Sequence, residues 1–570
     1  MTTKSENPRW VLHPNHASPR ARELAETLGA PRAFGQVLVN RGLTTAETAR
    51  RFLEPSPDHL HDPRLLLDLD RATDRVRRAI ANRERILVQG DYDVDGVTST
   101  FVLTTALREL GADVHWRIPH RTREGYGLSL MAVEEAAALQ CTLIVTVDCG
   151  ITAIEPVEHA RVRGIDTVVT DHHEAGGELP AAVALVDPNR PGCPYPFRPL
   201  AGVGVTFKLV EALFEGCGGR TRALGYLDVV SLGTIADVVP LVGENRVLAW
   251  LGLEALNHTQ RPGLKALREV AGLADKTITG GHVAFVLAPR INAAGRMGDA
   301  DQAMRLLLTH DRHEAAALAE SLEEDNRRRR ALDEEVALDA SARVESELGW
   351  PDCASILLWS ERWHPGVLGI VASRLVERFR RPTVLVALDR ERGRGSGRSV
   401  PGVDLTRVLD GCGDLLESHG GHAHAAGLAV VRAQLPALRE RLERVVREHF
   451  VPDDLPPRLE IDADLTLGEC DLALARWLER LAPHGPGNPE PLFRSEAVTV
   501  ESVRQVGEGR HLRLLLRDAT GALEAIGFGL GGQADEVARR GRCAAAYLPQ
   551  RNEWMGEMRL QLKLKEIRVE

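Results

Sequence analysis

Acidic and imidazole side chains directly follow three short apolar runs in the N-terminal half of the chain. The runs are RILVQG (85–90), TLIVTV (142–147) and DTVVT (166–170). The side chains that follow them are Asp91, Asp93, Asp95, Asp148, Asp171, His172 and His173. Carboxylates that converge in one crevice would repel one another by several kcal/mol at an effective dielectric constant of about 20. A group of positive charge must compensate for this repulsion.

A pair of divalent cations is the simplest compensation, because no lysine lies in these motifs. Oxygen ligands with one or two imidazoles suit Mn²⁺, and Mg²⁺ is the alternative. Two such ions about 3.5–4 Å apart hold a phosphoryl group and support in-line attack on it. The pattern predicts two-metal phosphoester hydrolysis. Since adjacent histidines point apart, we expect one of the pair to bind metal and the other to face the substrate.

The elements that must position these side chains are strands of a parallel sheet. Further strand candidates lie at 113–118 and 184–186, and helical segments at 97–110, 132–139 and 156–163 separate the strands. Strands that alternate with helices of about a dozen residues predict a doubly wound α/β domain. The carboxyl ends of parallel strands share one edge of the sheet, where ligands bind. We therefore expect the acidic groups to meet there.

Each motif has a simpler alternative when it is taken alone. Asp91-Tyr-Asp-Val-Asp-Gly96 matches the start of an EF-hand calcium loop, which requires a preceding helix and a glutamate at the twelfth position, here Val102. Asp148 or Asp171 could cap a helix, and the two histidines could be ordinary loop residues. The coincidence of acids at three strand ends favours the metal site.

The remainder of the chain predicts further units. Short helices are expected at 21–28 and 46–52, and 301–348 is expected to form one long connecting helix, since apolar residues recur there at helical spacing. A second, smaller α/β unit opens with 354–358, 367–379 and 383–387. A Pro-rich linker (452–457) precedes five strands and one helix, which predict an OB-like barrel. The strand ranges are 497–503, 511–516, 523–529, 544–549 and 559–567, with a helix at 533–539.

Composition sets the class of protein. The chain has 570 residues, which corresponds to about three to five domains. Its net charge of −10 excludes a uniformly basic nucleic-acid coat but not a local basic groove. The eight cysteines form no C-x-x-C pair, which argues against a zinc site or a disulfide framework. With no apolar run of 18 residues and a polar N-terminus, we expect a cytoplasmic protein with no membrane segment.

The motifs resemble a known family in combination and order. QGDYDVDG (89–96), TVDCG (146–150) and TDHHE (170–174) are similar to motifs of the DHH phosphoesterase superfamily. Eight further segments make the chain resemble the RecJ family of bacterial single-strand-specific 5′→3′ DNA exonucleases over nearly all residues after 60. These are PHRTREGYGL (119–128), LGTIADVVPL (232–241), APRINAAGRMG (288–298), WHPGVLGIVASR (363–374), GSGRS (395–399), HGGHAHAAG (419–427), GPGNPEPLF (485–493) and NEWMGEMRLQL (552–562).

The resemblance implies a division of the chain and a set of metal ligands. It implies an N-terminal helical extension (1–75), a DHH domain (76–300), the connecting helix (301–348), a DHH-associated domain (349–452) and an OB-like domain (453–570). It implies two Mn²⁺ ions, or Mg²⁺, held by Asp91, Asp93, Asp95, Asp148, His172 and Asp237. Asp148 is the expected bridge between the ions, and His173 is expected to contact the scissile phosphate or a metal-bound water.

The resemblance also implies contacts to single-stranded DNA. Arg121, Ser396 and Arg398 are expected to hold the 5′ phosphate, and His422 to face the crevice. Arg290, Asn292 and Arg296 are expected along the substrate path. In the OB-like domain the candidates are Tyr547, Trp554, Phe493 and Phe528 with Arg510, Arg513 and Arg551, and Phe528 is expected to be a core residue.

Two alternatives of other classes remain beside this exonuclease. One is a DHH hydrolase of oligoribonucleotides, cyclic dinucleotides or pyrophosphate; chain length and the OB-like module argue against it. The other is a non-catalytic replisome scaffold, against which the complete acidic set argues. The resemblance further implies cooperation with a single-strand-binding protein and a RecQ-type helicase, and we expect a monomer.

Overall fold

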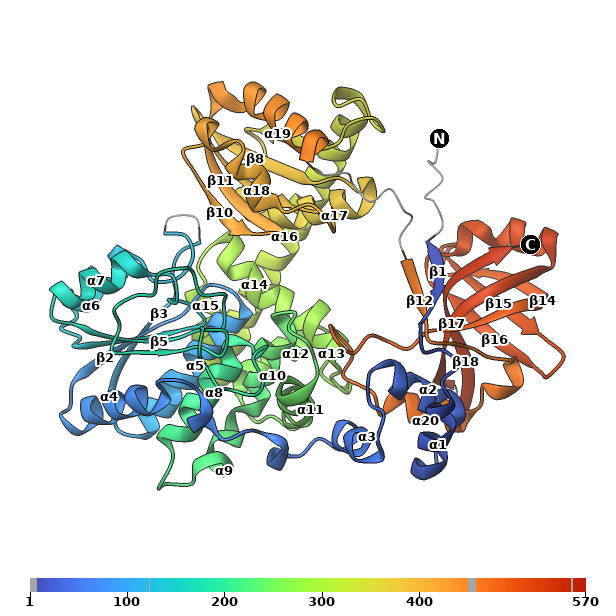
Figure 1. Ribbon diagram of the computed structural model, residues 1–570, viewed down its shortest axis with the longest axis horizontal. Helices are drawn as coiled ribbons and strands as arrows, with labels where there is room; N and C mark the ends of the chain where they lie inside the picture. The colour runs from blue at the N-terminus through green and yellow to red at the C-terminus, as the bar shows by residue number, and fades with distance from the viewer. Residues whose placement is uncertain (1–7, 122–123, 450–457, 555–556, 570) are drawn as a thin grey trace.

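A parallel sheet forms the centre of the first unit. The computed structural model describes residues 8–121, 124–449, 458–554 and 557–569 (Figure 1). The sheet has the order β3-β2-β4-β5-β6, and all neighbouring strands are parallel. Its strands are β2 (Arg85–Gln89), β3 (Asp113–Arg117), β4 (Leu143–Val147), β5 (Asp166–Thr170) and β6 (Ala184–Val186). The predicted doubly wound α/β domain is confirmed.

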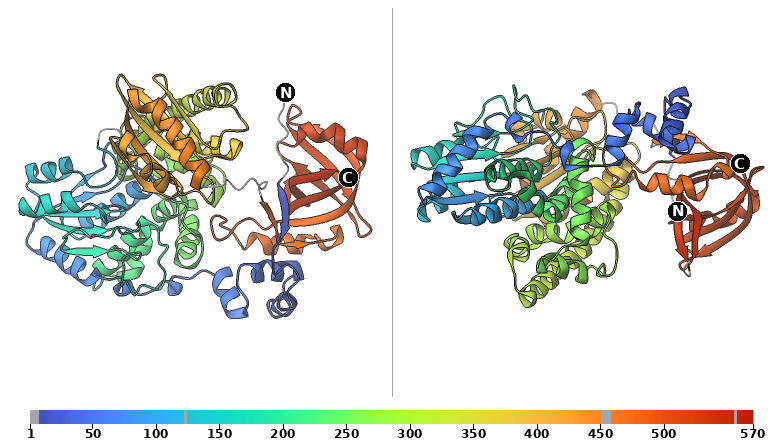
Figure 2. Two further views of the ribbon diagram at one scale, coloured as in Figure 1. Left: turned by 45° about the horizontal axis from the view of Figure 1, so that its top comes forward. Right: turned by 90° about the horizontal axis from the view of Figure 1, so that it is seen from below.

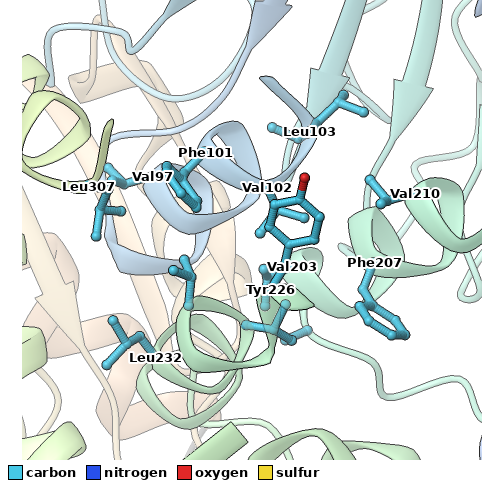
Figure 3. Close-up of a cluster of buried hydrophobic side chains, with 14 of the residues drawn as sticks. Val97, Phe101, Val102, Leu103, Val203, Phe207, Val210, Tyr226, Leu232 and Leu307 are labelled. Carbon is cyan, nitrogen blue, oxygen red and sulfur yellow. The ribbon is translucent and has the colours of Figure 1, made fainter. Parts of the chain in front are cut away.

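Helices cover both faces of this sheet. They are α4 (Leu69–Ala81), α5 (Val94–Glu109), α6 (Leu130–Ala138), α7 (Ile154–Val162) and α8 (Gly202–Leu213). Side chains of α5, α8 and α10 (Leu227–Ala236) pack into one buried cluster, to which Phe101, Phe207 and Leu232 belong (Figure 3). Because α5 is buried along most of its length, the loop before it, which carries the first acidic motif, is held firmly against the sheet.

Further helices extend the first unit toward the middle of the molecule. They are α9 (Gly219–Ala223), α11 (Gly243–Asn257), α12 (Pro262–Val270), α13 (Gly280–His282) and α14 (Ala288–Met297). A π-helical turn at Val283–Leu287 joins α13 to α14.

The prediction of one continuous helix over 301–348 is wrong. The segment forms α15 (Asp301–Leu308) and α16 (Arg312–Glu347), and Thr309 between them is extended. Asp311 caps α16 by accepting hydrogen bonds from the amides of His313 and Glu314, which ends the first helix and starts the second. The 36 residues of α16 then span the first unit and the second (Figure 1).

The second unit is a mixed five-stranded sheet in the order β10-β11-β9-β8-β7, in which only β7 and β8 run parallel. Its strands are β7 (Ile356–Ser360), β8 (Thr383–Asp389), β9 (Arg392–Arg398), β10 (Ser418–His422) and β11 (Ala425–Val431). The helices are α17 (Leu368–Phe379), α18 (Leu405–Asp410) and α19 (Leu435–His449). This confirms a second, smaller α/β unit.

The C-terminal strands close into a barrel, as predicted. The order β14-β15-β16-β18-β17 returns to β14 through an additional β14–β17 pairing. The elements are β14 (Phe493–Val506), β15 (His511–Arg517), β16 (Ala522–Gly527), α21 (Ala534–Arg540), β17 (Arg542–Trp554) and β18 (Glu557–Val569). Before them come β12 (Arg458–Ile461), β13 (Ala463–Asp464) and α20 (Leu472–Glu479).

The N-terminal helices pack on this barrel and not on the parallel sheet. They are α1 (Pro19–Leu28), α2 (Arg32–Asn40) and α3 (Ala46–Leu53), and they share one apolar cluster with α20 and the barrel strands. Strand β1 (Arg9–Leu12) pairs in parallel with β12. Figures 1 and 2 show the blue N-terminal segment beside the red barrel, so the two ends of the chain form one body.

The barrel aromatics are distributed differently from expectation. Phe493 and Tyr547 are completely buried, so they are core residues and not stacking platforms. The expectation that Phe528 is a core residue is wrong, since 59% of its surface is exposed beside the ring of His511. The side chain of Trp554 lies outside the described residues. Among the helices that the structure describes, none combines the length and apolar character needed to cross a membrane.

Candidate active site

Three carboxylates surround one imidazole nitrogen; two of them follow the carboxyl ends of β2 and β4, and the imidazole follows that of β5. His172 Nε2 lies 3.1 Å from Asp148 Oδ1, 3.7 Å from Asp237 Oδ2 and 3.9 Å from Asp95 Oδ2. Asp237 reaches this point from the C-terminal end of α10. The predicted convergence of side chains that are far apart in the sequence is present in the fold.

A backbone carbonyl sets the orientation of the His172 ring. His172 Nδ1 lies 2.9 Å from the carbonyl oxygen of Leu200. Because a carbonyl only accepts, Nδ1 carries the hydrogen, and in the neutral ring Nε2 presents its lone pair to the carboxylates. This is the arrangement of a histidine prepared to bind a metal ion.

Three buried atoms in the cluster have no hydrogen-bond partner among the described residues: Asp148 Oδ1, His172 Nε2 and Asp237 Oδ2. Buried polar atoms are almost always satisfied, so three orphans facing one point indicate a ligand. Two groupings have donor atoms within 4.8 Å of one another, Asp148 with both histidines and Asp95 with His172 and Asp237. Carboxylate oxygens with one or two imidazoles fit Mn²⁺ or Mg²⁺.

Burial and mutual repulsion raise the pKa values of the acidic groups. The pKa of Asp148 lies well above its usual range because the group is buried and because Asp95 and Asp93 are close. The same causes raise the pKa of Asp237 to about 8, and burial raises that of Asp95 to about 6. A divalent cation would relieve this repulsion and favour the ionised forms.

Helix α8 begins against the acidic cluster. Both oxygens of Asp95 accept hydrogen bonds from its first amides, Gly202 N at 2.7 Å and Val203 N at 2.8 Å. A Cβ on Gly202 would lie only 2.4 Å from Asp148 Oδ1, so this position requires glycine. Asp148 itself has a φ of 60°, a left-handed conformation that aspartate tolerates better than most residues. The site thus depends on the left-handed backbone of Asp148 and on the lack of a side chain at Gly202.

The first motif is positioned by backbone amides. Asp93 Oδ1 accepts from Gly96 N at 3.0 Å and caps α5, and Asp91 Oδ1 accepts from Gly127 N at 3.3 Å. Since strand β2 and not a helix precedes this motif, the EF-hand alternative is wrong. Burial and the charge of Asp93 raise the pKa of Asp91 well above its usual range.

Asp171, to which the sequence assigned no specific role, and Tyr126, which it did not single out, hold the second histidine. Asp171 accepts four hydrogen bonds, from the amides of Ile151, His172 and His173 and from His173 Nδ1 at 2.7 Å. The Tyr126 hydroxyl lies 3.0 Å from Asp148 O and 2.9 Å from His173 Nδ1. Although burial lowers the pKa of His173, Asp171 raises it to about 9. Tyr126 lies in the motif PHRTREGYGL (119–128), so this motif could have identified it from the sequence.

A second cluster, of arginines, lies between the two α/β units. Arg398 on β9 has a lowered pKa because it is buried and because Arg121 of the first unit is close. Arg121 itself lies over the Tyr92 ring at 4.6 Å. Ser396 and Arg398 both border Gly369 on α17, where a Cβ would lie 3.0 Å from Ser396 Oγ and Arg398 Nη2. The structure thus brings Arg121, Ser396 and Arg398 into one neighbourhood.

The residues of α14 have mixed surroundings. Burial, Arg121 and Arg329 lower the pKa of Arg296 to about 9, so Arg296 belongs to the arginine cluster. Arg290 is buried and its Nε lies 2.7 Å from Glu323, while Asn292 accepts a hydrogen bond from Val94 N. Both therefore face protein partners.

His422 is exposed on β10, and no contact joins it to the acidic cluster among the described residues.

Comparison with known proteins agrees with this geometry. Residues 85–234 match the DHH family N-terminal domain, 353–448 the DHHA1 domain and 461–566 the RecJ OB domain. The single-stranded-DNA-specific exonuclease RecJ of Bacillus subtilis is 38% identical over 564 residues, covering 98% of this chain and 71% of that protein. The RecJ of Escherichia coli K12 is 35% identical, covering 96% and 98%.

The chain belongs to the RecJ family. The crystal structure of Thermus thermophilus RecJ in complex with Mn²⁺ superposes with a TM-score of 0.83 at 34% identity, covering 98% of this chain and 79% of that one. The corresponding Mg²⁺ complex gives a TM-score of 0.79 at 32% identity, covering 98% and 78%. The predicted resemblance to RecJ is confirmed over nearly the whole chain.

Proposed function

We propose that this chain is a metal-dependent exonuclease that degrades single-stranded DNA from its 5′ end, in recombination and repair. The observation that carries the proposal is the convergence of three buried, unsatisfied ligand atoms from Asp148, His172 and Asp237. Membership of the RecJ family supports the choice of substrate, because the relatives are named single-stranded-DNA-specific exonucleases.

We assign the metal-ligand role to the acidic cluster and expect two Mn²⁺ ions, with Mg²⁺ as the alternative. Solved RecJ structures with each of these ions support this assignment. The ligands are Asp93, Asp95, Asp148, His172 and Asp237, with Asp91 beside them. When bound, the cations neutralise charge on the phosphodiester and promote the attack of water on phosphorus. Asp148 lies closest to His172 Nε2, which supports its place among the residues that would hold the ions.

The residues of the chain orient the two imidazoles for different tasks. Leu200 O fixes His172 with Nε2 toward the acids. Asp171 holds His173 Nδ1 and favours its protonated form, so that Nε2–H of His173 can donate to a non-bridging oxygen of the scissile phosphate. Such a donor stabilises the charge that develops on that oxygen in the transition state.

In this proposal the arginine cluster explains why degradation starts at the 5′ end. Arg121 and Arg398 come from different units, and burial together with the charge of Arg121 lowers the pKa of Arg398. A terminal phosphate carries more charge than an internal phosphodiester, and paired guanidinium groups with Ser396 suit it. Holding a 5′ phosphate there would place the next phosphodiester toward the acidic cluster. Arg296 extends the cluster, while Arg290 and Asn292 position α14.

The other assignments are proposals of the same kind. We retain the five-part division at 1–75, 76–300, 301–348, 349–452 and 453–570, although the helices α1 to α3 pack on the barrel. Family resemblance supports cooperation with a single-strand-binding protein and a RecQ-type helicase, and we expect a monomer in the cytoplasm. His422 is proposed to contact DNA from the exposed face of β10.

A nuclease assay tests the proposal directly. With Mn²⁺ or Mg²⁺, a 5′-labelled single strand should release labelled mononucleotide at once, a 3′-labelled strand should shorten progressively, and a duplex should resist. Equal attack on both ends or on the duplex would contradict the stated polarity or selectivity. Faster turnover of a dinucleotide than of the long strand would favour the small-substrate hydrolase, and no hydrolysis with either ion would favour the scaffold.

A further inference from the structure

A second cationic region is a cavity where the first unit meets the N-terminal helices. It has a volume of about 370 Å³, within the range of about 300–1,000 Å³ that small-molecule sites occupy. Its walls come from α3 and the loop before it, from the N-terminal end of α11 and from Gly487. Figure 1 shows α3 between α11 and the α1–α2 pair beside the barrel. None of the residues assigned above to metal or phosphate binding lines it.

Three arginines give this cavity its charge. Arg41, Arg51 and Arg246 line it, and no carboxylate lies at ion-pair distance from any of them among the described residues. Arg246 is only 2% exposed and donates to the carbonyls of Phe52, Leu481 and Arg480. These carbonyls satisfy the hydrogen-bond donors of Arg246, but they do not neutralise its positive charge.

Arg41 contributes an unsatisfied donor to the same place. Its Nη1 is buried without a hydrogen-bond partner among the described residues, while Nη2 donates to Pro489 O. The nearest acid, Asp462, already accepts from Asn40 Nδ2 and Leu492 N. Burial lowers the pKa of Arg41 to about 10, although Asp462 opposes this shift. Burial and the charge of Arg41 lower the pKa of Arg246 to about 9. A buried donor beside repelling cations is costly unless an anion joins them.

The other residues that line the cavity favour an anionic ligand with an apolar part. Val242 and Gly243 start α11, whose N-cap has no side-chain hydrogen bond, so the positive end of the helix dipole faces the cavity. The one carboxylate in the wall, Glu244, is neutralised by Lys208 at 2.6 Å. Leu43, Phe52, Pro55 and Val247 supply apolar surface.

We propose that this cavity binds a phosphate monoester with an apolar body, of the size of a nucleoside 5′-monophosphate, at the junction of the first unit with the N-terminal helices. The head group would meet Arg41 and Arg51, and the body would lie against Leu43 and Phe52. The ligand would contact both the first unit and the N-terminal helices. Because it would bind only when the two are packed together, it would stabilise that packing.

Calorimetric titration of the full chain with 5′-dTMP tests the proposal. The background is Arg398→Gln with EDTA, which weakens the proposed 5′-phosphate site and removes any metal. One dTMP should still bind, inorganic phosphate should compete with it, and thymidine should not bind detectably. Absence of binding in this background, or binding of thymidine as tight as that of dTMP, would overturn the proposal.

A matched pair of variants on α3 identifies the site. Arg51→Gln should weaken dTMP binding by about tenfold, the effect of losing one charged hydrogen bond. The exposed neighbour Arg50 provides the control, and Arg50→Gln should bind like the background protein. Leu43→Trp fills the cavity without removing charge and should also prevent binding. If Arg51→Gln and Leu43→Trp both bind dTMP like Arg50→Gln, the ligand lies elsewhere and the assignment is wrong.

Discussion

His172 Nε2 and Asp148 Oδ1 lie 3.1 Å apart, yet neither atom makes a hydrogen bond within the described chain. The ring donates from its other nitrogen to Leu200 O, so in the neutral ring Nε2 and the carboxylate oxygen confront each other as two acceptors. Two buried acceptors at this distance repel each other, so they need a proton or a metal cation between or beside them. Although burial lowers the pKa of His172, Asp237 and Asp95 raise it overall, which favours a proton on this ring when no metal is bound. This relationship motivates the first prediction.

Replacing Asp148 should abolish hydrolysis and leave the fold intact. Asparagine has a similar shape and tolerates the left-handed conformation, so Asp148→Asn removes the charge alone. We expect kcat on 5′-phosphorylated single strands to fall by at least about 10³-fold, the scale of losing a group that stabilises the transition state. In EDTA the variant should melt no lower than the parent chain, because one repelling charge is gone. Activity near that of the parent would exclude the two-metal interpretation.

Asp171→Asn should impair the enzyme through His173. The amide can accept from the backbone amides but cannot hold His173 in its charged form as the carboxylate does. We expect activity to fall by about 10–100-fold, as for residues that orient catalytic ligands. The pH at which activity falls on the alkaline side should shift downward, whereas a purely structural role would lower activity at every pH alike.

Stability of the metal-free chain should decrease as pH rises. In the folded state the pKa of Asp95 is about 6 and that of Asp237 about 8, both above the model-peptide value of 3.8. Because these pKa values are raised in the folded state, ionising the two acids costs more free energy there than in the unfolded chain. The folded state therefore keeps its full stability below pH 3.8 and loses stability as the pH rises to about 8. The melting temperature in EDTA should therefore fall between pH 5 and pH 8, roughly the window between those pKa values.

Mn²⁺ should reverse this loss, because it binds the ionised carboxylates. The difference in melting temperature between Mn²⁺ and EDTA should grow with pH over the same window. Equal differences at both ends of the window would show that the acidic cluster does not hold the ion.

Arg398→Gln should remove the preference for a phosphorylated end. Parent enzyme should degrade 5′-phosphoryl strands faster than 5′-hydroxyl strands, and the variant should degrade both at similar rates. Loss of one charged hydrogen bond corresponds to about 1.5–3 kcal/mol, or about 10–150-fold in kcat/KM. Arg407→Gln, at an exposed arginine on α18, is the control and should keep the preference. A variant that loses activity on both strands equally would place Arg398 outside the 5′-phosphate pocket.

Phe528→Ala should weaken binding of single-stranded DNA to the barrel. The ring is exposed beside His511, and a stacked base contributes about 1–3 kcal/mol. Fluorescence anisotropy with a labelled oligonucleotide measures the change. Met558→Ala, an exposed apolar residue on β18, serves as the comparison and should bind normally. Unchanged affinity in both variants would mean that DNA does not stack on Phe528.

The sequence alone was sufficient for the chemistry of the site and for its supporting sheet. Strands β2 to β6 lie within about a residue of their predicted ranges, because runs of buried aliphatic residues between helices leave few alternatives. Acids at the ends of such strands must share an edge, which is a consequence of parallel topology. The separation of α15 from α16 was missed because neither Pro nor Gly interrupts the segment. The signals that mark the break are the absence of apolar residues at 309–314 and Asp311, which caps α16.

Only the tertiary structure decided which groups face which. Asp237 lies at the end of a buried helix, where no local pattern marks it, and it reaches His172 only because α10 packs on α5 and α8. Phe528 is exposed because it lies in the turn directly after β16, which the predicted strand 523–529 had included, whereas Tyr547 on β17 is buried. Helices α1 to α3 pack on the barrel through contacts between residues hundreds of positions apart. The cationic cavity depends on contacts of the same kind. Such contacts form by burial of shared surface, and local sequence does not encode their partners.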